Sequence, residues 1–104
     1  MFARVTIFKE PVDEGIRVTR DRVVPVVLGL SGSKGGFFLV NRKSGKTLSL
    51  TLWESEEALR ASEAPIAKLR AERVVEIPGS ETLDVDEYEV IFHPRLASRE
   101  GSSS

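Results

Sequence analysis

Residues 37–53 read Phe37-Phe-Leu-Val-Asn-Arg-Lys-Ser-Gly-Lys-Thr-Leu-Ser-Leu-Thr-Leu-Trp53, two apolar runs around a Ser44-Gly45 pair. A glycine-containing turn between two such runs is typical of a β-hairpin, so we predict strands over 37–42 and 46–53. Leucine occupies every second position at the end of the second strand, and alternating side chains point to the same face of a sheet. The hairpin therefore contributes two antiparallel strands to the predicted fold.

A helix is predicted directly after the hairpin. Ser55 is a good N-cap residue, and two glutamates follow it in the first turn, where carboxylates are favourable. Pro65 suits the first turn of a new helical segment, so we predict a break near Glu63. Ile66, Leu69 and Arg73 then continue one stripe along the helix.

The segments on either side complete the pattern. Residues 2–8 alternate as a strand that ends before Pro11. Asp13 can cap a helix, which we expect to kink at Pro25 because proline removes an amide donor. The apolar stripe of this helix consists of Ile16, Val23, Val27 and Leu30. Residues 85–93 alternate again and form the last predicted strand.

The order strand–helix–strand–strand–helix–strand predicts a ferredoxin-like α+β domain, with an antiparallel four-stranded sheet and both helices on one face. We expect three rows to face the helices, namely Ala3/Val5/Ile7, Leu48/Leu50/Leu52 and Tyr88/Val90/Phe92. We expect the other face to carry Phe2, Phe8, Trp53 and Ile91, with Arg4 near Glu87 or Glu89. Because such a face is too apolar to remain in water, we predict that two copies pack through it as a homodimer.

The charges of the chain support interleaved halves. Residues 1–52 carry nine basic and four acidic side chains, whereas residues 53–104 carry six basic and twelve acidic ones. Two separate domains of about fifty residues would each be marginal for folding. Strands from the two halves are therefore expected to alternate in one sheet, where opposite charges can face each other.

The composition restricts the class of protein. The chain has 104 residues, 40% hydrophobic and 30% charged, with no cysteine and a formal net charge of -1. We expect one domain over 1–95 and a disordered polar tail over 96–104. The absence of cysteine excludes a disulfide scaffold and a thiolate-ligated metal site. The charge argues against nucleic-acid binding, and no apolar run is long enough for a membrane span, so we expect a cytoplasmic protein.

Two stretches resemble the antibiotic biosynthesis monooxygenase-like proteins of the dimeric α+β barrel superfamily. They are Gly35-Gly-Phe-Phe-Leu-Val-Asn-Arg-Lys-Ser-Gly-Lys46 and Leu50-Thr-Leu-Trp-Glu-Ser-Glu-Glu-Ala-Leu-Arg-Ala-Ser62. The resemblance covers roughly residues 2–93 and implies a homodimer, with a ligand cavity between each sheet and its own helices. Members include cofactor-independent oxygenases of aromatic polyketides, haem-degrading enzymes and proteins of unassigned reaction.

This chain lacks key residues of the haem-degrading members. Those proteins combine an Asn on the first strand with a His on the second helix. Here the first strand has Arg4 and Thr6, and His93, the only histidine, ends the last predicted strand. Haem degradation by that mechanism is therefore not expected, and we expect no metal or other cofactor.

The resemblance to the polyketide oxygenases implies a site of Asn, Trp, Tyr and Arg side chains, which this chain has as Asn41, Trp53, Tyr88 and Arg42. Trp53 and Tyr88 would position a hydrophobic or aromatic ligand, and Asn41 or Arg42 would polarise a developing oxyanion. Structural roles are the more common alternatives: Trp53 as an anchor at the dimer interface, and Tyr88 as a core residue. The sequence is thus compatible with a monooxygenase-like small-molecule-binding protein or with a non-catalytic stress or accessory dimer.

Three further groups are more typical of solvated surface than of a site. They are the arginines Arg17, Arg20 and Arg22, the acidic run Asp84, Asp86, Glu87 and Glu89, and the lone His93.

Overall fold

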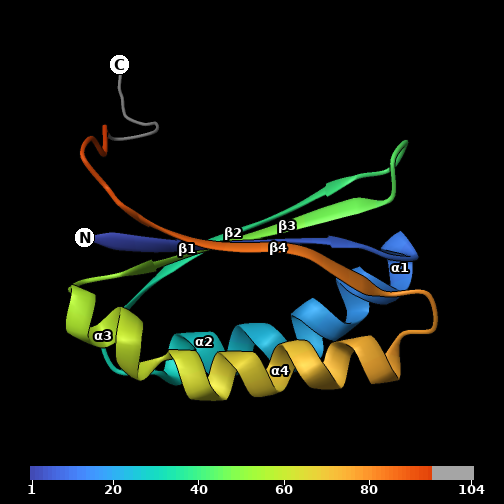
Figure 1. Ribbon diagram of the computed structural model, residues 1–104, viewed down its shortest axis with the longest axis horizontal. Helices are drawn as coiled ribbons and strands as arrows, with labels where there is room; N and C mark the ends of the chain where they lie inside the picture. The colour runs from blue at the N-terminus through green and yellow to red at the C-terminus, as the bar shows by residue number, and fades with distance from the viewer. Residues whose placement is uncertain (95–104) are drawn as a thin grey trace.

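The chain forms two layers, a four-stranded antiparallel sheet and a layer of helices that covers one face of it (Figure 1). The computed structural model describes residues 1–94. The polar tail predicted over 96–104 lies outside these residues. Within them, no helix has the length and apolar character that crossing a membrane requires.

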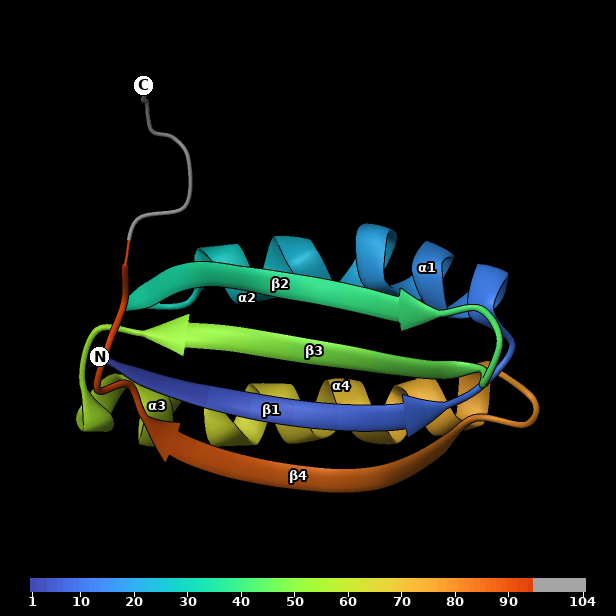
Figure 2. The same cartoon turned by 90° about the horizontal axis from the view of Figure 1, so that it is seen from above.

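The elements follow in the order β1 (Phe2–Lys9), α1 (Val12–Val18), η1 (Thr19–Val23), α2 (Val24–Gly29), β2 (Ser33–Asn41), β3 (Lys46–Trp53), α3 (Glu56–Ala61), α4 (Glu63–Glu76) and β4 (Glu81–Glu89). The strands lie side by side in the order β2-β3-β1-β4, as seen from above in Figure 2. This succession and strand order confirm the predicted ferredoxin-like α+β fold.

The two oppositely charged halves of the chain are interleaved, as predicted. β1, from the basic half, pairs with β3 on one side and with β4, from the acidic half, on the other. The register sets Arg4 opposite Glu87 and Lys9 opposite Glu81. Such cross-strand pairs of opposite charge favour this strand order over the alternatives.

The first helical stretch leaves α-helical geometry just before Pro25. η1 is a π-helical turn, in which the amide of Val24 donates to the carbonyl of Thr19, five residues earlier. Proline crowds the carbonyl four residues before it, here that of Asp21. A π turn relieves this crowding because its hydrogen bonds span one residue more. The irregularity predicted at Pro25 is therefore present, as a π turn that precedes the proline.

The second helical stretch begins and breaks where the sequence indicates. The Ser55 hydroxyl caps α3 by accepting a hydrogen bond from the amide of Ala58 at 3.1 Å. α3 ends at Ala61 and α4 begins at Glu63, which places Ser62 at the break. The buried Ser62 hydroxyl is thereby available to the sheet below it.

The last strand begins four residues earlier than predicted. β4 pairs with β1 from Glu89, opposite Phe2, back to Glu81, opposite Lys9, with a register shift where β1 passes from Ile7 to Phe8. This irregularity interrupts the alternation around residue 83, so the local pattern did not reveal where the strand starts. The prediction of residues 85–93 was wrong at both ends.

The helices cover the face of the sheet that was predicted to be uncovered. Nη1 of Arg4 donates to the Ser62 hydroxyl at 2.9 Å, and its Nη2 donates to the carbonyl of Leu59 at 3.0 Å. Because Arg4 points into the helix layer, the alternate β1 residues lie on the uncovered face. The registers add residues of β2, β3 and β4 to this open face, which includes Ala3, Val5, Ile7, Phe37, Leu39, Leu48, Leu50, Leu52 and Tyr88, with Asp84 and Asp86 on β4.

The residues expected on the uncovered face lie elsewhere. Trp53 is fully buried beneath the helices, and Phe2 packs against the same cluster. The ring of Phe8 lies under the guanidinium of Arg73, at 4.6 Å, on the helix side. Ile91 follows the end of β4 and is 78% exposed. Alternation distinguishes two faces but not which of them the helices cover, and that choice was wrong.

The core lies at the end of the molecule where the hairpin strand enters α3. Its buried cluster consists of Val27, Trp53, Leu59 and Ile66, from both helical stretches and β3. Trp53 is held in place by a hydrogen bond from Nε1 to the Thr51 hydroxyl at 3.0 Å. This cluster joins the helices to the sheet beside the cavity described next.

Candidate functional site

A cavity of about 290 Å³ lies between the sheet and the helices. Its floor is formed by residues of β1, β2 and β3, and its other walls come from α1, η1, α2 and α4. The π turn contributes Thr19, Arg20 and Val23 to the wall. π-helical turns are frequent at functional sites, because they redirect side chains out of the regular helical order.

The lining of the cavity is apolar, with hydroxyl groups on its floor. Apolar side chains come from both layers, among them Phe8, Ile16, Val23, Phe38, Ile66 and Leu69. Thr6, Thr47 and Ser49 lie on the same face of the neighbouring strands β1 and β3. A mostly apolar pocket with a few polar groups is the usual composition of a small-molecule site.

A buried ion pair borders the cavity. Arg73 of α4 donates from Nε to Oε1 of Glu10 at 2.9 Å and from Nη2 to Oε2 at 2.6 Å. Oε1 also accepts from the Ser80 hydroxyl at 2.9 Å, and Oε2 from the Thr47 hydroxyl at 3.0 Å. All four of these residues are buried. The cluster ties β1, β3, α4 and the start of β4 together behind the cavity wall.

The pKa of Glu10 follows from this environment. Burial of the carboxylate by itself raises the pKa, but the hydrogen bonds and charge of Arg73, with the hydroxyls of Ser80 and Thr47, outweigh it and hold the pKa below its ordinary value. The carboxylate is thus ionised at neutral pH, and each oxygen already accepts two hydrogen bonds. Glu10 is therefore suited to holding Arg73 and unsuited to acting as a general base.

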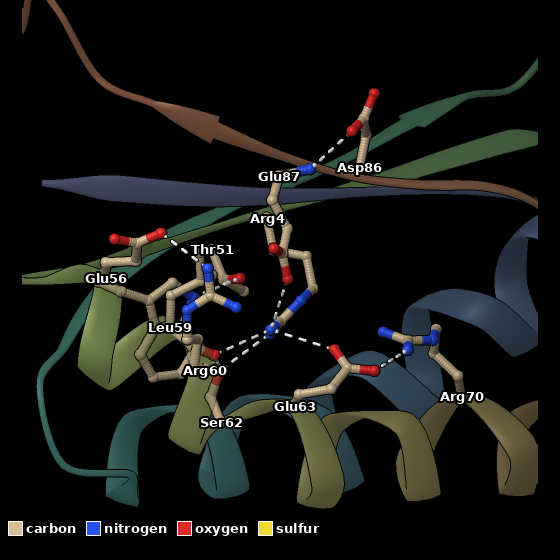
Figure 3. Close-up of polar contacts among 11 residues, drawn as sticks. Arg4, Thr51, Glu56, Leu59, Arg60, Ser62, Glu63, Arg70, Asp86 and Glu87 are labelled. Atoms are coloured by element: carbon tan, nitrogen blue, oxygen red, sulfur yellow. Dashed lines mark hydrogen bonds and ion pairs between the residues drawn. The ribbon is translucent and has the colours of Figure 1, made fainter.

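A second buried arginine, Arg4, connects the sheet to the break between α3 and α4 (Figure 3). Its Nη2 lies 3.2 Å from Oε1 of Glu63 and 3.3 Å from Oε2 of Glu87. The other oxygen of Glu63 accepts from Nη2 of Arg70 at 2.9 Å. Glu63 is therefore shared between two arginines, of which Arg70 lines the cavity.

Two of the sequence-predicted site residues, Trp53 and Tyr88, lie on opposite sides of the sheet. Trp53 is in the core cluster, and Tyr88 is half exposed on the open face, where its hydroxyl donates to Oδ2 of Asp86 at 3.3 Å. The negative charge of Asp86, with its hydrogen bond, raises the pKa of Tyr88 above the ordinary value. The phenol therefore stays protonated at neutral pH.

The other two, Asn41 and Arg42, lie at the hairpin turn. Oδ1 of Asn41 accepts from the amides of Lys43 and Ser44 at 3.0 and 3.1 Å, which shapes the turn. Arg42 is exposed and pairs with Asp13 at 3.2 Å. None of the four predicted residues is among the described residues that line the cavity, and the structure does not bring them together. Their role in ligand binding stays a prediction.

The sequence analysis missed the arginines of α4 as site residues. Arg73 carried a signal, because it continues the apolar stripe of Ile66 and Leu69, and a charge in such a stripe indicates a buried partner. Arg70 carried none. Within residues 1–94, no cluster of three or more His, Cys, Asp or Glu side chains is placed to hold a metal ion.

Comparison with known sequences identifies relatives without an assigned function. No family model matches the chain. The chain is 35% identical over 106 residues to the uncharacterized protein Rv2557 of Mycobacterium tuberculosis, a match that covers 98% of this chain and 46% of that protein. The chain thus spans about half the length of the curated relatives it matches.

Comparison with solved structures identifies the fold. An antibiotic biosynthesis monooxygenase candidate from Deinococcus radiodurans has a TM-score of 0.71 at 11% identity, over 94% of this chain and 100% of that one. The heme-degrader MhuD of M. tuberculosis, solved with two hemes in its active site, has a TM-score of 0.62 at 19% identity, over 91% of this chain and 100% of that one. The monooxygenase ActVA-Orf6 of Streptomyces coelicolor, solved with Nanaomycin D, has a TM-score of 0.62 at 17% identity, over 96% of this chain and 92% of that one.

These neighbours share one architecture and differ in the reactions that their names state, so the fold by itself does not identify a reaction. Element order, strand order and the extent of the superpositions agree with the resemblance found in the sequence. The chain therefore has the ferredoxin-like fold of the antibiotic biosynthesis monooxygenase-like proteins.

Proposed function

We propose that this protein binds a small hydrophobic or aromatic molecule in the cavity between its sheet and helices, and that any reaction there is monooxygenase-like. The observation that carries the proposal is the apolar cavity of about 290 Å³ with hydroxyl groups on its floor. This volume is near the lower end for ligand pockets, which favours a ligand of about two or three rings. ActVA-Orf6, a monooxygenase solved with Nanaomycin D, has the same fold and supports this class of ligand.

The lining favours binding over acid–base catalysis by the protein. The only carboxylate in the adjoining cluster of described residues, that of Glu10, is saturated with hydrogen bonds. A monooxygenase-like reaction would therefore depend on the reactivity of the ligand itself, which the cavity would hold and shield from water. The alternative is a non-catalytic stress or accessory protein, which would leave a bound molecule unchanged in the presence of oxygen.

Fluorescence titration with N-phenyl-1-naphthylamine tests the binding. This neutral probe of three aromatic rings becomes fluorescent outside water, and we expect one molecule per chain with a Kd on the order of 10 µM. Ser49→Phe fills the floor of the cavity and should weaken binding at least tenfold. Phe37→Glu, on the open face, is the matched control and should leave the affinity within about threefold. Equal effects of the two substitutions, or no saturable binding, would contradict the proposal.

We also propose that two copies of the chain pair through the open face. Three of its side chains, Phe37, Leu39 and Tyr88, are 46%, 53% and 51% exposed, next to the valine, isoleucine and leucine side chains of β1 and β3. An apolar surface of this kind, bordered by Asp84 and Asp86 on the edge strand β4, usually marks an interface. A two-fold axis along the strands would lay the acidic β4 of one chain over β2 and the basic hairpin of the other.

A further inference from the structure

Arg70 of α4 has a donor at the cavity for which the described residues offer no acceptor. It lines the cavity, its side chain is 17% exposed, and its Nη2 is bound to Glu63. Its Nη1 is buried and has no hydrogen-bond partner within residues 1–94. Figure 3 shows the guanidinium on the side of α4 that faces the sheet. A buried guanidinium nitrogen without an acceptor is costly, because its interaction with water is lost and not replaced.

We infer that the cavity takes an amphipathic acid, whose apolar rings fill the space between sheet and helices and whose anionic oxygen accepts a hydrogen bond from Nη1 of Arg70. This inference rests on the proposed binding function and specifies the class of ligand. Carboxylates, sulfonates and phenolates share the required chemistry, since each offers a negative oxygen to a planar guanidinium.

The charges around the cavity favour an anion. The charged side chains among its described lining residues are Arg20, Arg70 and Arg73, and none is acidic. Arg73 is already bound to Glu10 and to the carbonyl of Gly15, and Arg20 is held by the neighbouring Asp21. With Arg73 and Arg20 paired in this way, the positive charge left for an incoming negative group is that of Arg70, and a low local dielectric strengthens its attraction.

Arg70 is also the least neutralised arginine of the buried network. Its partner Glu63 divides its two oxygens between Arg70 and Arg4, so neither arginine has the carboxylate to itself. Arg4 also has a buried nitrogen, Nε, that has no partner among the described residues, but Arg4 does not line the cavity. A guanidinium nitrogen without an acceptor therefore indicates a ligand only at Arg70, which lines the cavity.

Two probes with the same skeleton separate this inference from the proposed function. N-phenyl-1-naphthylamine is neutral, and 8-anilinonaphthalene-1-sulfonate adds one sulfonate to the same rings. Both are titrated into the wild type and into Arg70→Met, Arg70→Lys and Glu63→Gln, with Arg60→Met as the control. Arg60 lies on α3, is exposed and pairs only with Glu56 among the described residues. Thermal unfolding of every variant establishes that it is folded.

The sulfonate probe should bind the wild type more tightly than the neutral probe. Arg70→Met should weaken the sulfonate probe about tenfold or more and leave the neutral probe within about threefold, because only the charged hydrogen bond is lost. Arg70→Lys should restore part of the affinity, since lysine keeps the charge without the planar fork. Glu63→Gln should strengthen sulfonate binding about threefold, because it removes the competing carboxylate, and Arg60→Met should change neither probe.

The results that would contradict the anionic anchor differ from those that would contradict the proposed function. Neutral-probe binding that Ser49→Phe abolishes, together with a sulfonate affinity that Arg70→Met leaves unchanged, would overturn the anionic anchor and leave the proposed function in place. Equal weakening of both probes by Arg70→Met would also overturn it, since Arg70 would then only shape the cavity. If neither probe bound the folded wild type, both proposals would fail.

Discussion

Arg73 is the side chain on which the cavity wall most depends. It binds both oxygens of Glu10, donates to the carbonyl of Gly15 at 3.1 Å, and lies over the ring of Phe8. Only 5% of its side chain is exposed, and the Glu10 side chain is not exposed at all. A pair so buried is stable only while both partners are present, because a single buried charge has no water to replace the missing one.

Arg73→Met should therefore lower the free energy of unfolding by about 3–5 kcal/mol. The substitution keeps most of the apolar stem but leaves the Glu10 carboxylate unpaired. Urea denaturation followed by circular dichroism measures the loss. Arg60→Met, which breaks the exposed pair with Glu56, should cost less than about 1 kcal/mol and serves as the control. Similar small losses in both variants would mean that the Glu10–Arg73 pair contributes no more than a surface pair.

The protein should lose stability in acid because the Glu10 carboxylate becomes protonated. Because its pKa is lower in the folded than in the unfolded chain, the unfolded state binds more protons between the two values. The stabilisation is therefore complete above the unfolded pKa, about 4.3, and is lost as the pH falls through the folded value. Urea midpoints measured from pH 6 to pH 3 should decline less steeply in Glu10→Gln than in the wild type. An unchanged slope would assign the acid sensitivity to other carboxylates.

At the scale of single residues, the sequence indicated that a charged side chain is buried but not which residue it contacts. Arg73 lies at an apolar position of its helix, which predicts a buried charge. Its partner Glu10 is 63 residues away, and Arg4 meets Ser62 across 58 residues. No local pattern specifies contacts over such distances, so the four residues chosen for their chemistry, including Trp53, were not those that line the cavity.

Among the elements, α1 is adapted to the buried pair through Gly15. A Cβ atom at this position would overlap Oε2 of Glu10 and approach the guanidinium of Arg73. Glycine at a helical position costs stability relative to alanine, so its presence here has a packing reason. The missing side chain allows the start of α1 to pass directly over the carboxylate.

Gly15→Ala should accordingly destabilise the protein by about 1–3 kcal/mol, although alanine is the better helix former. Gly29→Ala is the matched control, because Gly29 is also helical and no atom of residues 1–94 lies within 4 Å of its Cβ position. We expect the control to be neutral or to stabilise by up to about 1 kcal/mol. Thermal unfolding of both variants measures the difference. A Gly15→Ala protein as stable as the control would show that Glu10 can move without cost.

Element boundaries were predictable where a local signal sets them. The Ser55 cap and the helix break before Glu63 depend on neighbours in the sequence, and both were right. The start of β4 depends on pairing with β1 and on a register irregularity, and it was missed by four residues. Likewise, the periodicity of β1 and β3 separated their two faces, but the position of the helices was not contained in that pattern.

For the whole molecule, the two sides of the sheet have separate roles in our proposals. Polar residues such as Arg4, Thr47 and Ser49 lie on the helix side, where partners or the cavity satisfy them. The open face is apolar along β1 and β3, carries Asp84 and Asp86 on β4, and has no cover from the described residues. The predicted homodimer therefore rests on a different set of residues than expected.

Sedimentation velocity at micromolar concentration should show a dimer of about 23 kDa, twice the chain mass of 11.5 kDa. Phe37→Glu places a negative charge on the open face, opposite the acidic β4 of the second copy, and burying it there would cost several kcal/mol, enough to shift the protein to monomer. Val75→Glu, at an 85% exposed position of α4, is the matched control and should leave the dimer intact. Since the cavity lies within one chain, the Phe37→Glu monomer should still bind the neutral probe. A wild-type monomer, or a dimer that Val75→Glu disrupts and Phe37→Glu does not, would place the contact elsewhere and leave the open face without a partner.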